Sequence, residues 1–469
     1  MRRTAWEILR SMVGRSVSPT EVLRETLERI AEHDATFHAY VTVDGGRAET
    51  AAQAAEEAYA TGEAGPLAGL PVSIKDLFDV EGEVAGCGVS TSPRSTPAVS
   101  SAAVVRRLEA AGAVIVGRTH LHPLAFGLTG ENPQLVTPQN PRDHGAMPGG
   151  SSSGSAVSVA AGLAYASIGT DTGGSVRVPA AFCGVVGFKP SHGAIDAAGV
   201  FPVAPSIDHV GVLARSVADC RLIFEALVDP ADVALVSRWR REGAGEKGVG
   251  RGEGGIFRVG ILGDFHERAQ AAVRASIEET LASASASASA EVEVCTVRLG
   301  DALSPGKRAY GPLVLAEIAA THEALLATQP ENYDVEARAM VEKGTTVRAV
   351  DYLHADAHRR TFRDAVHALF DAENLDALAL PTVGIPAPDL GATRVDVDGR
   401  SRSLAGVLVE GTSLFSLIGV PAISVPARPV EGRPVGLQLV ARRGDDALLL
   451  RVAGAIEVAS GGPAPIAEL

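Results

Sequence analysis

The sequence predicts an α/β fold in which a large central mixed β-sheet is flanked by helices on both faces (α/β/α). The chain has 469 residues, of which 46% are hydrophobic and 21% are charged, so it can bury a large core. Short apolar runs typical of buried strands alternate with segments whose apolar residues recur at helical spacing. The interruptions in this alternation do not separate independent units, so we expect one domain over residues 1–469.

The first part of the chain predicts peripheral helices followed by the first strands. Residues 4–60 have the apolar spacing of amphipathic helices, and Ser18, Pro19 and Glu21 form a helix-start signal inside this stretch. The elements expected next are a buried strand at 69–74, a helix at 101–111 and a strand at 113–116.

Residues 145–193 differ from the rest of the chain because they are dense in Gly, Ser and Ala. A flexible Gly/Ser linker is one interpretation of such a composition. Residues 157–163 and 166–168, however, have the patterns of an ordered helix and strand. We therefore expect an ordered stretch whose small residues let neighbouring backbones approach closely.

The second half of the chain predicts the rest of the sheet. Residues 231–255 are rich in Gly, Arg and Glu with little periodicity, which indicates an exposed loop. Residues 256–469 resume the alternation and are expected to supply the remaining strands and their covering helices. The expected strands are 257–262, 375–381, 421–426 and 436–440, with a helix from Ala269.

Charge and apolar patterning exclude several classes of partner. The formal net charge is −14 and no cluster of Lys and Arg is present, which disfavours nucleic acid and anionic membranes. The chain start lacks an apolar signal region, and no stretch of about 18 apolar residues follows, so we expect a cytoplasmic protein. Its four cysteines form no CxxC pair, which argues against a disulfide framework and a zinc site. A small-molecule substrate is the expected partner, and a homodimer is compatible with the sequence.

A glycine turn before Ser175 is the most informative feature. The segment GTDTGGSVR, residues 169–177, leaves a predicted strand and turns on Gly173 and Gly174 before this serine. Glycines there allow unusual backbone angles and expose consecutive N–H groups, which can stabilise a developing oxyanion. Ser175 is therefore the natural candidate for a nucleophile.

A nucleophilic serine needs a base, and no histidine lies within this Gly/Ser-rich core. Lys75 instead ends the apolar run PVSIK, where a lysine is costly to bury. Burial lowers the pKa of a lysine and can make its neutral amine a base near neutral pH. A plain ion pair between Lys75 and Asp76 or another carboxylate explains this segment equally well when it is viewed alone. As a base, Lys75 requires Asp76 to point elsewhere, because a facing carboxylate opposes that pKa shift.

The third segment, PGGSSSGS at residues 148–155, consists of small residues that can lie against both others and relay a proton between them. Together, the three segments resemble the amidase signature family. The resemblance continues through VVRRL and GAVIVG, residues 104–117, to the C-terminal stretches PTVGIPAP, GVPAISVP and PVGLQLV. The separation between Ser151 and Ser175 is 24 positions (175 − 151), the usual one in that family, and it selects Ser151 among the three adjacent serines.

The resemblance implies a Ser-Ser-Lys amidohydrolase with a catalytic core over residues 65–225. Such an enzyme cleaves the C–N bond of a small amide, or a carbamate or ester, through an acyl-enzyme and needs no cofactor or metal. The implied roles are Lys75 as base, Ser151 as relay on an unusual cis peptide and Ser175 as nucleophile. The implied oxyanion hole consists of the N–H groups of Thr172, Gly173, Gly174 and Ser175, and the residues implied to hold the triad in place are Ser152, Asp171 and Arg177.

The sequence departs from the family pattern at three places. Ser153 replaces a usual glycine, and Ser416 stands where asparagine is common. After Gly117-Arg118-Thr119 the family usually continues with Asn and, three residues later, Glu. Here the chain reads HLHP, residues 120–123, so a substrate preference cannot be carried over.

Three competing interpretations remain open at this point. The stretch 150–154 matches the G-x-S-x-G nucleophile elbow of α/β-hydrolases, which makes Ser152 the nucleophile, although no apolar strand precedes it. His120 and His122, with His144 further along the chain, resemble part of a metallohydrolase site, but no Cys/His motif completes it. The first component of a tRNA-dependent amidotransferase, its A chain, shares the three segments and works with partner subunits.

Overall fold

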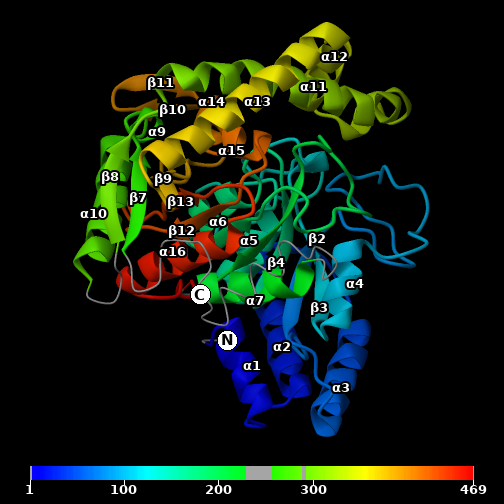
Figure 1. The fold of residues 1–469 in the computed structure, drawn as a ribbon. Coiled ribbons are helices and arrows are strands. Elements are labelled where there is room, and N and C mark those ends of the chain that lie inside the picture. The colour runs from blue at the N-terminus through cyan, green and yellow to red at the C-terminus, as the bar shows by residue number, and fades with distance from the viewer. Residues whose placement is uncertain (1–2, 229–255, 288–291, 468–469) are drawn as a thin grey trace.

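The computed structural model describes residues 3–228, 256–287 and 292–467, and within them eleven strands form one mixed sheet (Figure 1). The strand order is β1-β3-β2-β4-β6-β5-β12-β13-β9-β7-β8. The strands are β1 (Tyr40–Val43), β2 (Pro71–Lys75), β3 (Val114–Thr119), β4 (Ala166–Asp171), β5 (Val186–Lys189), β6 (His209–Ala214), β7 (Phe257–Leu262), β8 (Val292–Val297), β9 (Ala377–Pro381), β12 (Ala422–Pro426) and β13 (Gly436–Val440). A separate hairpin pairs β10 (Arg394–Val397) with β11 (Arg400–Ser403).

Helices cover both faces of this sheet, as the sequence predicts. On one face, α7, α10 and α16 pack with α1 and α4, and Val210 and Val212 of β6 point into this layer. Leu213, the next residue of β6, instead joins the cluster of α2 and α5 on the opposite face. The helices are α1 (Ala5–Val13), α2 (Pro19–Phe37), α3 (Gly45–Thr61), α4 (Ala103–Ala110), α5 (Ser153–Ala160), α6 (Arg177–Cys183), α7 (Val217–Leu227), α9 (Gly263–His266), α10 (Ala271–Ala286), α11 (Leu303–Thr328), α12 (Val335–Thr345), α13 (Ala349–Ala372), α14 (Leu404–Glu410), α15 (Ser413–Leu417) and α16 (Asp446–Ala459), with short 3-10 turns η1 (Pro123–Ala125), η2 (Gly300–Ala302) and η3 (Pro330–Asn332).

The strand pairing places the candidate site at one edge of the sheet. β2 runs parallel to β4, with Val72 opposite Ala166 and Ile74 opposite Ile168. Lys75 ends β2, and Asp171 ends β4. Because adjacent parallel strands end at the same edge, their terminal side chains lie close together.

The N-terminal region corrects one prediction. A capping box forms between Ser18 and Glu21 at the start of α2, as the sequence predicts. The expected helical stretch 4–60 is, however, interrupted by β1, which pairs antiparallel with β3. A strand of four residues shows too little alternation to be distinguished from the ends of the helices around it.

The Gly/Ser-rich stretch is ordered and fully packed, as expected. It forms α5, β4, α6 and β5, whose residues are all buried. The glycines permit close contacts: a Cβ added at Gly154 would lie 2.4 Å from the Ala39 carbonyl oxygen. Such spacing excludes any larger residue at this position.

Three other expectations meet the structure differently. Residues 231–255, predicted to be an exposed loop, lie outside the described residues. No helix among the described ones is long and apolar enough to cross a bilayer. The four cysteines are free thiols; Cys87, Cys183 and Cys220 are buried, and Cys295 is partly exposed.

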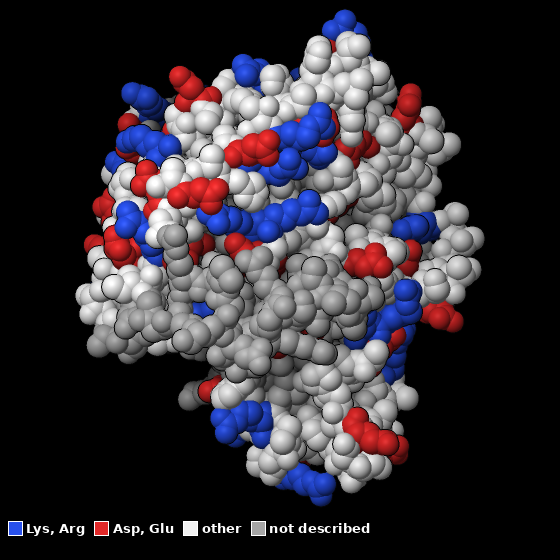
Figure 2. All heavy atoms as spheres, viewed as in Figure 1, with Lys and Arg blue, Asp and Glu red and all other residues white. Residues whose placement is uncertain are grey.

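The helices α11–α13 form a layer whose surface carries charges of both signs (Figure 2). On α13, Arg348 pairs with Asp351 and Arg359 pairs with Asp356. Interspersed pairs of this kind differ from the basic stripe that a phosphate backbone requires.

Candidate active site

The site brings together Lys75, Ser151 and the turn that carries Ser175. Lys75 Nζ donates hydrogen bonds to Ser151 Oγ at 2.7 Å and to Thr170 Oγ1 at 2.8 Å. Ser151 follows a cis peptide bond with Gly150. The Ser152 N–H donates to the Ser175 carbonyl oxygen at 3.2 Å, which holds the 150–153 loop against the turn. Lys75 and Ser151 are fully buried, and Ser175 is 4% exposed.

Burial controls the charge of Lys75. Desolvation lowers the pKa of its amine to about 7, while the negative charges of Asp171 and Asp208 oppose this shift. Asp76 points away, as the sequence analysis requires: its carboxylate accepts hydrogen bonds from Arg118 Nε at 2.5 Å and from the Gly86 N–H at 3.0 Å. A substantial fraction of the Lys75 amine is therefore neutral near pH 7 and can accept a proton.

The turn after β4 is built around the Asp171 carboxylate. Oδ1 accepts the N–H of Gly174 at 2.9 Å, and Oδ2 accepts the N–H of Val176 at 3.2 Å. Gly174 has a φ of 132°, and a Cβ added to it would lie 2.4 Å from Thr412 Oγ1, so the turn requires glycine here.

This geometry corrects the expected oxyanion hole. The N–H of Gly174 is already bonded to Asp171 and is not free to bind an oxyanion. For the N–H groups of Thr172, Gly173 and Ser175, no acceptor occurs in the part of the chain that the structure describes. These three donors remain as candidates.

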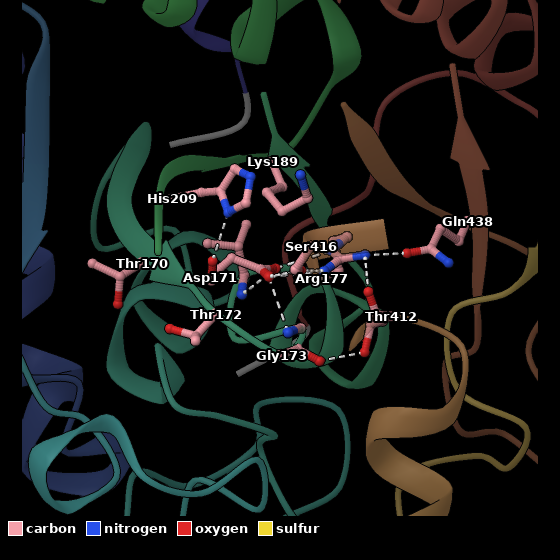
Figure 3. A network of polar contacts seen from close by, with 12 residues as sticks. Thr170, Asp171, Thr172, Gly173, Arg177, Lys189, His209, Thr412, Ser416 and Gln438 are labelled. Atoms are coloured by element: carbon pink, nitrogen blue, oxygen red, sulfur yellow. Dashed lines mark hydrogen bonds and ion pairs between the residues drawn. The ribbon is translucent and has the colours of Figure 1, made fainter. Parts of the chain in front are cut away.

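Asp171 forms a buried ion pair with Arg177 at the centre of a polar network (Figure 3). Arg177 Nε bonds to Oδ2 at 2.9 Å and Nη2 to Oδ1 at 2.8 Å, a bidentate arrangement. Burial alone would raise the pKa of the Asp171 carboxyl, but Arg177 holds that pKa well below its ordinary value. The carboxylate is thus charged whenever the protein is folded near neutral pH.

Residues from the C-terminal half complete this network. Ser416 Oγ donates to Asp171 Oδ1 at 3.0 Å and accepts from Arg177 Nη2 at 2.6 Å. Arg177 Nη1 reaches Gln438 Oε1 at 2.6 Å. The hydroxyl of Thr412 donates to the Gly173 carbonyl oxygen at 2.5 Å and so fixes the turn itself. The segment around α15 and β13 therefore anchors the turn that carries Ser175.

Sequence reasoning missed four residues near this turn. Thr170 bonds to Lys75, and Asp208 accepts a hydrogen bond from Thr172 Oγ1 at 2.6 Å. Gln438 and Thr412 support the network described above. Gln438 gave a usable signal, because a lone amide in the apolar strand β13 needs a buried partner.

Comparison with known proteins identifies the family. The family model described as Amidase matches residues 21–450. The chain belongs to the Amidase family. It is 33% identical to AtzE, the 1-carboxybiuret hydrolase subunit of Pseudomonas sp. (strain ADP), over 95% of this chain and 96% of that protein. It is 36% identical to the A chain of the glutamyl-tRNA(Gln) amidotransferase of Anaeromyxobacter dehalogenans (strain 2CP-C), over 97% and 96%. A solved amidase structure superimposes with a TM-score of 0.84 at 36% identity, covering 98% of this chain and all of that chain.

Membership of the Amidase family confirms the resemblance drawn from the three segments and the predicted mixed α/β architecture. The chain is thus a hydrolase of carbon–nitrogen bonds other than peptide bonds.

The geometry around Ser152 does not fit a nucleophile elbow. Ser152 is fully buried, its Oγ donates to the Thr170 carbonyl oxygen at 3.2 Å, and it accepts the Thr170 N–H at 3.3 Å. The residue precedes α5 but follows a loop instead of a strand. Its hydroxyl therefore ties the relay loop to β4.

The two histidines of the HLHP segment do not form a metal pair. Burial lowers the pKa of both imidazoles to about 4, but the charges that act on them differ: His38 for His120, and Asp334 and Lys75 for His122. His144 packs edge-on against Phe37. Across residues 3–228, 256–287 and 292–467 no group of three or more His, Cys, Asp or Glu side chains could hold a metal ion.

Proposed function

We propose that this member of the Amidase family cleaves the C–N bond of a small amide through Ser175, Ser151 and Lys75. The observation that carries the proposal is the 2.7 Å hydrogen bond between Lys75 Nζ and Ser151 Oγ, formed by a buried amine with a pKa of about 7. In the acylation step, Ser175 Oγ attacks the carbonyl carbon while its proton passes to Ser151 and that of Ser151 to the neutral Lys75. The same relay then returns a proton to the leaving nitrogen, and water releases the acyl group from Ser175.

The oxyanion of the tetrahedral intermediate would be stabilised by the turn after β4. Backbone N–H groups of Thr172, Gly173 and Ser175 are the proposed donors, since the N–H of Gly174 is held by Asp171. Tyr310 lies over this turn, because a Cβ added at Gly173 would be 2.8 Å from its hydroxyl oxygen. The acyl carbonyl group therefore has a narrow place to bind.

Asp171, Arg177 and Ser152 have a positioning role in this proposal. Asp171 orients the turn through two backbone N–H groups, and Arg177 holds Asp171 through two parallel hydrogen bonds. Ser152 fixes the relay loop to β4. A preorganised site of this kind needs little rearrangement when charge develops in the reaction.

A second candidate function is supported by the relatives. One relative of nearly equal length belongs to an amidotransferase, and another is one subunit of a hydrolase. The chain could accordingly act with partner subunits instead of alone. A homodimer and a cytoplasmic location remain predictions from the sequence.

The test is hydrolysis by the purified chain alone, with Ser175→Ala as the matched control. A panel of neutral amides, aryl carbamates and aryl esters distinguishes the bond type. Turnover by the wild-type chain, lost in Ser175→Ala, supports the stand-alone hydrolase. Turnover only after partner subunits are added supports the second candidate, and turnover that persists in Ser175→Ala contradicts the proposed nucleophile.

A further inference from the structure

His122 belongs to the HLHP segment that departs from the family pattern, and it lies directly beside the proposed relay. Its backbone N–H donates to the carbonyl oxygen of Ser151 at 3.1 Å. The charge of Lys75 is also among the influences on its imidazole. The side chain is partly exposed, whereas Lys75 and Ser151 are fully buried. His122 therefore borders the space through which a substrate reaches the relay.

The imidazole of His122 is held in one position. A Cβ added at Gly127 would lie 2.2 Å from Nε2, so the ring rests on the bare α-carbon of this glycine. On its other side, Nδ1 lies 3.5 Å from Thr129 Oγ1. Since Thr129 Oγ1 accepts the N–H of Glu131 at 3.3 Å, its own proton is free to point at Nδ1. This arrangement places the imidazole proton on Nε2 and makes that atom a hydrogen-bond donor.

The surroundings of His122 are mostly uncharged. Burial, with the charge of Lys75, lowers the pKa of its imidazole to about 4 although Asp334 opposes the shift, so the ring is neutral where Lys75 is neutral. Phe126, from the same segment, packs against His322 with ring centroids 4.8 Å apart, and Tyr333 packs against both rings. His322 is likewise neutral, because burial lowers its pKa to about 4. This wall suits an aromatic, uncharged group.

We propose that His122 is a specificity-determining residue whose Nε2–H donates a hydrogen bond to an acceptor on the leaving amine of the substrate. The inference rests on the proposed function, in which Ser151 returns the proton to the leaving nitrogen. His122 is bonded to Ser151 itself, whereas the proposed oxyanion donors belong to residues 172–175 on the acyl side. The substrate class that fits is an amide of an uncharged aryl amine bearing a carbonyl or similar acceptor.

The test compares two aryl amides that differ only in a ring acetyl group, acetanilide and 3-acetylacetanilide. The readout is the ratio of their kcat/KM values, because a general loss of activity cancels in this ratio. His122→Leu is expected to lower the ratio about tenfold, the order expected when a site built to hydrogen-bond a group loses that bond. His122→Gln, which keeps a donor, is expected to recover most of it. Gly127→Ala is expected to lower it as well, because the added methyl group displaces the ring.

His120→Leu is the matched control, since His120 is buried in the same segment and the charge near it is that of His38. It is expected to leave the ratio unchanged whatever it does to total activity. An unchanged ratio in His122→Leu, or an equal fall in His120→Leu, overturns the inference while leaving the proposed function intact. If the wild-type chain hydrolyses neither amide and no serine-reactive probe labels Ser175, the proposed function fails and this inference fails with it.

Discussion

The pH dependence of catalysis follows from the burial of Lys75. With a pKa of about 7, roughly half of its amine is neutral at pH 7. A solvated lysine with a pKa of about 10.4 would be neutral in only about one molecule in 2,500 at that pH. Because the neutral amine is the active form, kcat/KM is expected to fall about tenfold between pH 8 and pH 6. The activity should thus rise with pH and level off above about pH 8.

The perturbation that isolates this effect is Lys75→Ala, assayed on an amide and an ester with the same acyl group. Removal of a general base costs typically about 10²- to 10⁴-fold, and the amide should suffer most because its poor leaving group needs a proton from Ser151. An activated ester should retain more activity. The pH dependence between 6 and 8 should disappear from the variant.

Asp76→Asn provides the control at the same end of β2. Asp76 bonds to Arg118 and to the Gly86 N–H, so its substitution should affect stability but leave the midpoint of the pH profile in place. Equal losses on amide and ester in Lys75→Ala, with an unchanged pH profile, would show that Lys75 only holds the fold.

Two further predictions concern the buried network and the absence of a metal requirement. Arg177→Gln leaves the Asp171 carboxylate buried without its ion-pair partner, so the free energy of unfolding should fall by about 3–5 kcal/mol, against about 1 kcal/mol for Ser416→Ala, measured by urea denaturation. Similar small losses in both variants would contradict the central position of the ion pair. Dialysis against EDTA should leave amide hydrolysis unchanged because no proposed step uses a metal; a loss restored by zinc would refute the serine mechanism.

The sequence predicted those parts of the fold that depend on local pattern. Strands such as Phe257–Leu262 and Gly436–Val440 are apolar runs bounded by polar or turn residues, and the structure has them at the expected positions. The β1 strand was missed because four residues that pair at the edge of a sheet leave almost no periodic signal.

The candidate site was predicted where consecutive residues carry the chemistry and missed where distant segments meet. Ser175 and Asp171 lie in one motif, whereas Thr412 and Gln438 reach the turn from more than 200 positions away. Only packing of α15 and β13 against the turn reveals their contacts. The assignment of Gly174 as an oxyanion donor failed for the same reason, since the direction of one N–H depends on how the turn folds back onto Asp171.

The substitution of asparagine by serine at position 416 is explained by the network. Ser416 Oγ bonds to both Asp171 and Arg177, so the smaller hydroxyl bridges the ion pair directly. Ser153 has no such explanation: its hydroxyl is buried without a partner among the residues that the structure describes.

The central claim is that Ser175 is the nucleophile, and covalent labelling tests it most directly. The wild type, Ser175→Ala and Ser152→Ala would be treated with a serine-reactive fluorophosphonate, and the modified residue would be located by mass spectrometry of the peptides. We expect labelling at Ser175 in the wild type and in Ser152→Ala, and no labelling in Ser175→Ala. Modification of Ser152 at the wild-type rate in Ser175→Ala would contradict the account.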